Sequence, residues 1–121
     1  MSQFISIKDN QPTLGKHNQI IGAYLYDSRG ESVGKIESLL LDAQTRKPQF
    51  LTLQLGGFLR TAGKHILIPF ELCEPQDLGK VVIQRSHHSL ADAPATENPD
   101  APSALEIELS LEYFDRATPA G

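Results

Sequence analysis

The sequence predicts a small, mainly β domain, an antiparallel barrel or sandwich of short strands with one or two short helical turns. Two observations favour this fold class. Short apolar or alternating segments recur along the chain and are separated by turn residues rather than by long helical segments. At 121 residues the chain has the size of one domain, and its 40% hydrophobic and 21% charged residues are ordinary for a globular protein.

The first 19 residues are mostly polar, and we expect a loose N-terminal arm, over residues 1–17, that docks by Phe4 and Ile5, with an independent strand there as the less favoured alternative. The first confident strand covers residues 20–27, and the turn after it contains Asp27 and Gly30. The second strand covers residues 33–42. Gly34 indicates a bulge or a close backbone approach there, and Leu39-Leu40-Leu41 indicates burial on both faces or a sharp bend.

Three more strands and two helical turns complete the predicted barrel, which ends near residue 95. The strands cover residues 49–55, 65–70 and 80–84, and the helical turns cover 70–74 and 89–92. Residues 96–121 form an acidic linker and a C-terminal extension. From Glu97 onward the chain carries six acidic residues and one basic residue, Arg116.

The extension contains conflicting signals for its secondary structure. Ser103 and Glu106 fit a capping box, which starts a helix, and leucine and glutamate favour helices. Against this, apolar residues alternate strictly with polar ones from Leu105 to Tyr113, and only a strand would place them on one face. We therefore predict a strand over residues 104–113.

The central segment resembles the PRC-barrel family, which includes the cytoplasmic domain of the photosynthetic reaction-centre H subunit and the C-terminal domain of RimM. The resemblance covers residues 18–95. It is carried by Ile21-Gly22, Tyr26-Asp27, Gly30-Glu31, Val33-Gly34-Lys35-Ile36-Glu37, Leu41-Asp42, Gly56-Gly57-Phe58, Gly63-Lys64, Ile68-Pro69 and the segment from Leu90 to Pro94. It implies a compact antiparallel barrel of about six short strands, without a catalytic centre, that serves protein contacts or assembly.

From the resemblance and the surface pattern we expect a non-enzymatic protein-interaction module that forms a homodimer. It would regulate a membrane-associated electron-transfer complex from the cytoplasmic side. The alternative is a ribosome-assembly protein similar to RimM, although the net charge of −4 gives no reason to expect direct nucleic-acid binding. The expected surface residues are Phe58, Leu59, Arg60 and Lys64 of the loop and Leu105, Ile107, Leu109, Leu111 and Tyr113 of the tail.

Reactive chemistry is not indicated, and we predict no catalytic residues, no cofactor and no metal. Cys73 is flanked by Glu71 and Glu74 rather than by an electropositive setting, so a structural thiol is expected. A less favoured alternative is a metal-binding sensor built on His65, His87 and His88, but adjacent histidines on an extended chain point to opposite faces.

The sequence shows no signal-peptide pattern and no apolar segment of about 20 residues, the length that crosses a bilayer. We expect a cytoplasmic protein without membrane insertion. Peripheral association with a membrane is compatible with this expectation.

Overall fold

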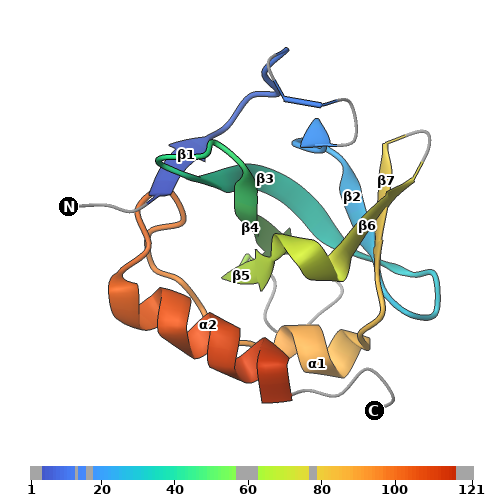
Figure 1. Ribbon diagram of the computed structural model, residues 1–121. Helices are drawn as coiled ribbons and strands as arrows, with labels where there is room; N and C mark the ends of the chain where they lie inside the picture. Colours follow the sequence, from blue (N-terminus) through green and yellow to red (C-terminus); the bar gives the residue numbers. More distant parts are fainter. Residues whose placement is uncertain (1–3, 13, 16–17, 57–62, 77–78, 117–121) are drawn as a thin grey trace.

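Within the described part of the chain, seven strands form one strongly curled sheet, with two α-helices on one side of it (Figure 1). The computed structural model describes residues 4–12, 14–15, 18–56, 63–76 and 79–116. The strands are β1 (Phe4–Ile7), β2 (Tyr24–Tyr26), β3 (Ser32–Asp42), β4 (Pro48–Leu55), β5 (His65–Pro69), β6 (Cys73–Gln76) and β7 (Lys80–Ile83). The helices are the 3-10 turn η2 (Phe70–Leu72), α1 (His87–Ala91) and α2 (Ala104–Arg116). The predicted mainly β class and both helical turns are confirmed.

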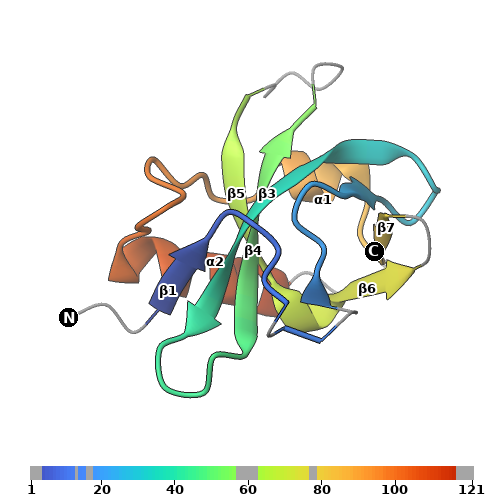
Figure 2. The same cartoon turned by 90° about the horizontal axis from the view of Figure 1, so that it is seen from above.

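The strands follow the order β5-β4-β3-β2-β7-β6, and all neighbours are antiparallel except β2 and β7. The long strand β3 carries β4 along one edge. On its other edge, β2 pairs with the first part of β3 and β1 pairs with the last part, from Ile7 opposite Leu39 to Phe4 opposite Asp42 (Figure 2). The expected loose arm is therefore wrong for residues 4–7, because the eleven residues of β3 extend beyond β2 and offer a free edge.

The two faces of the sheet are both apolar, as the three consecutive leucines predict. Leu39 and Leu41 belong to the main core inside the curl, where they are essentially inaccessible to solvent. Leu40 points the other way and forms a second cluster with Phe50 and Leu67. Phe4 and, from α2, Ile107 cover this second cluster. The part of the outer face around Leu40 is thus covered by the two segments that flank the barrel in sequence.

Gly34 lies at a close backbone approach between β3 and β4, which confirms the sequence interpretation. A β-carbon added at Gly34 would fall well inside the van der Waals distance of the Gln54 carbonyl oxygen and 3.0 Å from its carbonyl carbon. The pairing of β2 with β3 also shifts register here, since Leu25 faces Gly34 while Tyr26 faces Ser32. The bulge leaves Val33 as the extra residue of β3.

The tail strand is a wrong prediction, because residues 104–116 form α2. The capping-box signal prevailed over the alternation of leucine and glutamate. Ser103 Oγ accepts a hydrogen bond from the Glu106 amide (3.1 Å), and the Glu106 carboxylate accepts one from the Ser103 amide (3.0 Å). Among the described residues, none of the helices combines the length and apolar character that crossing a bilayer requires.

The β3–β4 hairpin stores backbone strain at Arg46, whose φ of 63° lies in the left-handed region. We expect Arg46→Gly to raise the free energy of unfolding by about 0.5–1 kcal/mol. Relief of about 1–2 kcal/mol of left-handed strain outweighs the cost of about 0.5–1 kcal/mol from a more flexible unfolded chain. Urea unfolding would measure the difference. Lys47→Gly is the matched control and should lose stability, and an equal loss in both variants would contradict the strain argument.

Candidate functional site

Helix α2 is anchored to the barrel through its capping box and one face. The Glu106 carboxylate accepts two further hydrogen bonds from the preceding segment, from the Thr96 hydroxyl and the Glu97 amide, both at 3.0 Å. Burial opposes ionisation of Glu106, but hydrogen bonds donated by Glu97, Ser103 and Thr96 outweigh it and hold the pKa of this carboxyl below its ordinary value. The start of α2 is therefore fixed to the chain that leads from the barrel.

The inner face of α2 is formed by Ile107, Ser110, Tyr113 and Phe114, at helical spacing. Ser110 Oγ donates a hydrogen bond to the Leu67 carbonyl (2.7 Å) on the edge strand β5, and the Tyr113 hydroxyl donates one to the Ser89 carbonyl (2.6 Å) on α1. Phe114, 3% exposed, enters the main core. Ile107 and Tyr113 thus pack inward and are not part of the expected exposed surface.

A buried arginine, which the sequence pattern does not single out, holds the other end of α2. Arg85 is 7% exposed and follows β7. Its Nη2 donates to the Phe114 carbonyl (3.3 Å) in the last turn of α2, and its Nη1 donates to the Gln84 carbonyl (3.1 Å). A cation there also complements the negative end of the helix dipole. The helix is consequently tied at both ends.

The outer face of α2 carries three of the four exposed large hydrophobic side chains of the described residues, and the fourth is Tyr24 on β2. Leu105, Leu109 and Leu111 are 62%, 42% and 47% exposed. Leu105 and Leu109 are four residues apart and lie together at one border of the exposed side of the helix, whereas Leu111 lies at the opposite border. Glu108, Glu112 and Asp115 are exposed on the same outer face. We call these six residues the α2 outer face.

The predicted loop surface is only partly described. Phe58, Leu59 and Arg60 lie outside the described residues. Lys64, which follows the loop, donates from Nζ to the Ala91 carbonyl at the end of α1 (2.8 Å). This hydrogen bond joins the residue before β5 to the end of α1, so Lys64 has a partner within the protein.

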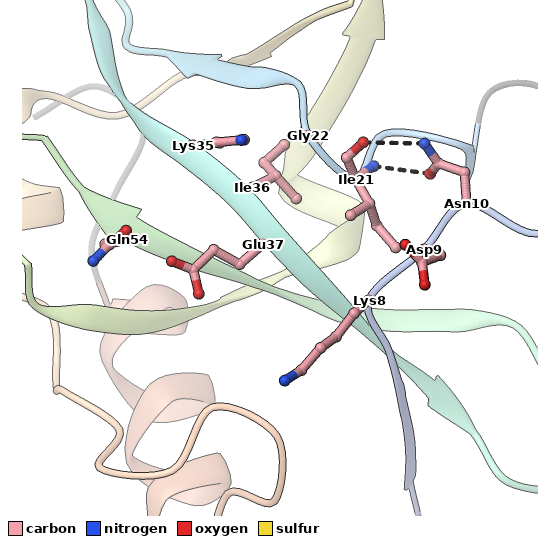
Figure 3. Close-up of a pocket in the computed structure, with 9 residues that line it drawn as sticks. All are labelled: Lys8, Asp9, Asn10, Ile21, Gly22, Lys35, Ile36, Glu37 and Gln54. Carbon is pink, nitrogen blue, oxygen red and sulfur yellow. Dashed lines mark hydrogen bonds between the residues drawn. The ribbon is translucent and has the colours of Figure 1, made fainter.

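A surface cleft of about 480 Å³ lies between the segment that follows β1 and the exposed side of β3 (Figure 3). Its lining alternates in charge, with Lys8 and Lys35 beside Asp9 and Glu37. Lys8 pairs with Asp100 (2.8 Å), and Asn10 exchanges two 3.0 Å hydrogen bonds with the backbone of Ile21. These contacts hold the N-terminal segment to the rest of the protein. The polar residues around the cleft therefore have a structural role and do not by themselves indicate a ligand.

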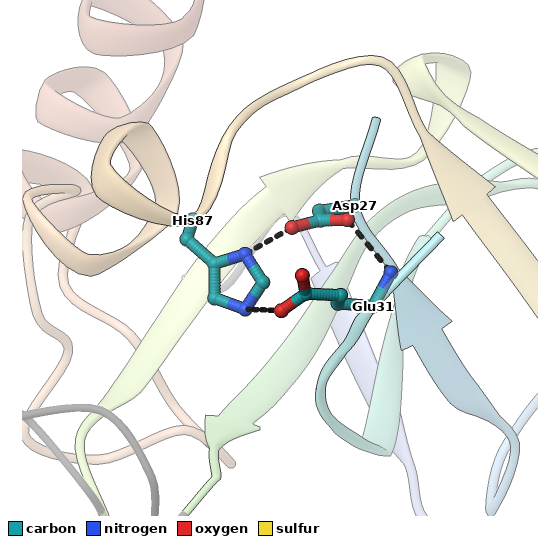
Figure 4. Close-up of side chains that lie close together, drawn as sticks. All are labelled: Asp27, Glu31 and His87. Carbon is teal, nitrogen blue, oxygen red and sulfur yellow. Dashed lines mark hydrogen bonds and ion pairs between the residues drawn. The ribbon is translucent and has the colours of Figure 1, made fainter. Parts of the chain in front are cut away.

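The histidines proposed for a metal sensor do not come together. His65 lies beside Glu37 (3.6 Å) on the sheet, and His88 is exposed on α1. His87 instead contacts Asp27 and lies 3.6 Å from Glu31, both from the β2–β3 turn (Figure 4). The sequence interpretation treated Asp27 as a turn residue, which its hydrogen bonds to the Arg29 and Glu31 amides confirm. It did not anticipate the contact with His87, because the two are 60 positions apart in the chain.

Cys73 is buried in the main core, and burial raises the pKa of its thiol from 9.0 to about 12. The thiolate is therefore scarce near neutral pH, which supports the structural role predicted for this residue.

The raised pKa of Cys73 makes stability depend on pH in the alkaline range. Since the unfolded thiol ionises near pH 9 and the folded thiol near 12, its contribution is complete below pH 9 and falls as the pH rises toward 12. Urea unfolding at pH 8, 9.5 and 10.5 should show a steeper alkaline loss for the parent protein than for Cys73→Val. Parallel curves for the two proteins would contradict the shift.

Fold and surface together define a small β-barrel module with a helix docked on its outer face. The family model of the PRC-barrel domain matches residues 14–87, more than half of the chain. The protein therefore belongs to the PRC-barrel family, whose members are in general non-catalytic modules. No curated protein matches the sequence. The matched region ends before α2, so the helix and its exposed leucines are additions to the family domain.

Proposed function

We propose that the protein is a protein-interaction module and that the α2 outer face is its docking surface. The observation that supports this most is the exposure of Leu105, Leu109 and Leu111 on a helix that is fixed to the barrel along its opposite side and at both ends. A rigid helix presents its side chains without an ordering cost on binding. Exposed apolar residues gathered on one element are typical of interaction sites.

The charge on this face favours one kind of partner. Glu108, Glu112 and Asp115 lie between Leu111 and the pair Leu105 and Leu109, so the matching surface would carry lysine or arginine at its centre with apolar contacts on both sides. A second copy of the chain would bring like charges together across the contact. The homodimer expected from the sequence is therefore the second candidate, and a basic protein partner is the first. The identity of this partner would decide between the two expected roles, regulation of an electron-transfer complex and ribosome assembly.

Site-specific photocrosslinking in the native cell tests the proposal. Benzoylphenylalanine at Leu109 should capture a specific protein with a basic apolar segment, and Leu105→Ser should reduce the yield at least tenfold. The same probe at the exposed Gln44, in the β3–β4 hairpin, is the matched control and should capture nothing comparable. Equal adducts from both positions, or none from Leu109, would contradict docking on this face.

Sedimentation velocity on the purified protein separates the two candidates. A basic heterologous partner predicts a monomer at micromolar concentration, whose mass is unchanged by Leu105→Ser with Leu109→Ser. A homodimer through this face predicts a dimer that the double variant dissociates, together with crosslinks from Leu109 to the chain itself.

A further inference from the structure

We propose that Asp27, Glu31 and His87, which converge where the β2–β3 turn meets the start of α1, form a binding site for a divalent transition metal of the zinc class (Figure 4). One ligand atom from each residue can be chosen so that all three lie within 4.8 Å of one another. Because the two carboxylates and the imidazole come from distant parts of the chain, the fold creates this group. The inference does not depend on the docking function of α2.

The carboxylate of Asp27 is held in one orientation. Its Oδ1 accepts hydrogen bonds from the Arg29 amide (2.9 Å) and the Glu31 amide (2.8 Å). The remaining oxygen, Oδ2, is therefore aimed at His87, as Figure 4 shows. Two backbone bonds of this kind supply the outer support that fixes a metal-binding carboxylate.

The burial of Asp27 is the independent observation that points to a cation. The side chain is 1% exposed, and apart from the contact with His87, Oδ2 has no hydrogen-bond donor among the described residues. An ionised carboxylate out of reach of water is costly unless a positive charge or a full set of donors compensates it. A metal ion bound between Oδ2 and the imidazole would supply that charge.

His87 and Glu31 complete the donor set from the partly open side. The imidazole, whose side chain is 19% exposed, presents Nδ1 toward Asp27 and Nε2 toward Glu31. Glu31 is 65% exposed, and its carboxylate lies beyond hydrogen-bond distance of the ring at 3.6 Å. An imidazole binds a metal ion through one nitrogen, here Nδ1, so the Glu31 carboxylate would rotate from the Nε2 side of the ring to reach the ion, and its exposure leaves it room to do so.

The chemistry of the three donors selects the class of metal. One nitrogen and two carboxylate oxygens suit Zn²⁺ and related ions such as Co²⁺ and Ni²⁺, which take three protein ligands and leave a fourth position for water. Calcium requires about six to eight oxygen ligands, more than this group offers. The only thiol of the chain, Cys73, belongs to the main core rather than to this group, which disfavours ions that seek sulfur.

Isothermal titration of the purified full chain with Zn²⁺, after treatment with a chelator, tests the site. We expect one ion per chain with a Kd in the micromolar range or tighter, and a higher melting temperature with Zn²⁺ present. Glu31→Gln and His87→Gln should each weaken binding at least tenfold. Glu31 is exposed, so its variant keeps the fold even if His87→Gln, which circular dichroism would check, does not.

The controls use the other histidines of the described structure. His65→Gln removes a second histidine beside a glutamate, and His88→Gln removes the neighbour of His87 on α1, so both should leave the Kd for Zn²⁺ unchanged. The proposal is overturned if 100 µM Zn²⁺ gives no saturable binding. It is equally overturned if Glu31→Gln and a folded His87→Gln protein bind as tightly as the parent.

Discussion

Replacing Gly34 with alanine is expected to cost about 3 kcal/mol or more in the free energy of unfolding, the largest loss of any single methyl addition considered for this chain. The added β-carbon would overlap the carbonyl oxygen of Gln54 and press on the α-carbon of Leu55, 3.3 Å away. These are backbone atoms of the paired strand β4, so no side chain can rotate to make room. Relief requires β3 and β4 to separate at the centre of the sheet.

Urea unfolding, followed by circular dichroism, would measure the effect of Gly34→Ala. Gly15→Ala is the matched control, because a β-carbon at Gly15 meets nothing within 4 Å and its backbone is not left-handed. The control should change stability by less than about 0.5 kcal/mol. Similar values for the two variants would show that the strands do not approach as closely as described.

Phe114→Ala is the second large expected loss, about 3–4 kcal/mol. Phe114 is 3% exposed, packs in the main core and meets Tyr113 edge to face, with ring centroids 5.3 Å apart. Truncation would leave a cavity where the last turn of α2 meets the barrel, next to the carbonyl that receives Arg85. We therefore expect the helix to loosen from the sheet as well as the global stability to fall.

Leu109→Ala on the same helix is the control for Phe114→Ala. Leu109 is exposed on the outer face, so its truncation should change the free energy of unfolding by less than about 0.5 kcal/mol. Amide hydrogen exchange adds a local readout, since residues of α2 should lose protection in Phe114→Ala and keep it in Leu109→Ala. Equal losses in both variants would contradict the assignment of inner and outer faces.

The barrel was predictable because its signals are local and agree with one another. Turn residues such as Asp27 and Gly30 bound the strands, and the alternating Leu51, Leu53 and Leu55 of β4 are all buried on one side. The burial of Leu40 opposite its neighbours also followed from three leucines in a row. Propensity, pattern and turn chemistry point to the same structure, as expected for a well-specified sequence.

The prediction of a strand for the tail is wrong because some of its apolar residues pack against the barrel and others face solvent. The alternation rule assumes that every leucine seeks the core, which fails if Leu105, Leu109 and Leu111 face outward. The inner face uses Ile107 and Phe114 together with a serine, whose hydroxyl satisfies the Leu67 carbonyl at the sheet edge. A capping box at the right position was the better guide, because it reports local backbone bonding directly.

The grouping of Asp27, Glu31 and His87 was out of reach of sequence reasoning for a different reason. It depends on which strands become neighbours, and the pairing of β2 with β7 brings the residue after β2 beside the start of α1. Spacing along the chain contains no trace of such a pairing. The sequence alternative grouped His87 with His65 and His88, which the structure places elsewhere.

The parallel pairing of β2 with β7 also has a consequence for the order in which the domain folds. Tyr24 meets Lys80 and Tyr26 meets Val82, so this ladder closes the largest loop of any strand pair in the sheet. The β3–β4 hairpin and its neighbour β5 need only nearby sequence and are expected to form first. During synthesis, β2 therefore waits for residues 80–83 to emerge, and until then its outer edge has no partner strand. Closure of this ladder is the step that joins β7 and β6 to the rest of the curled sheet.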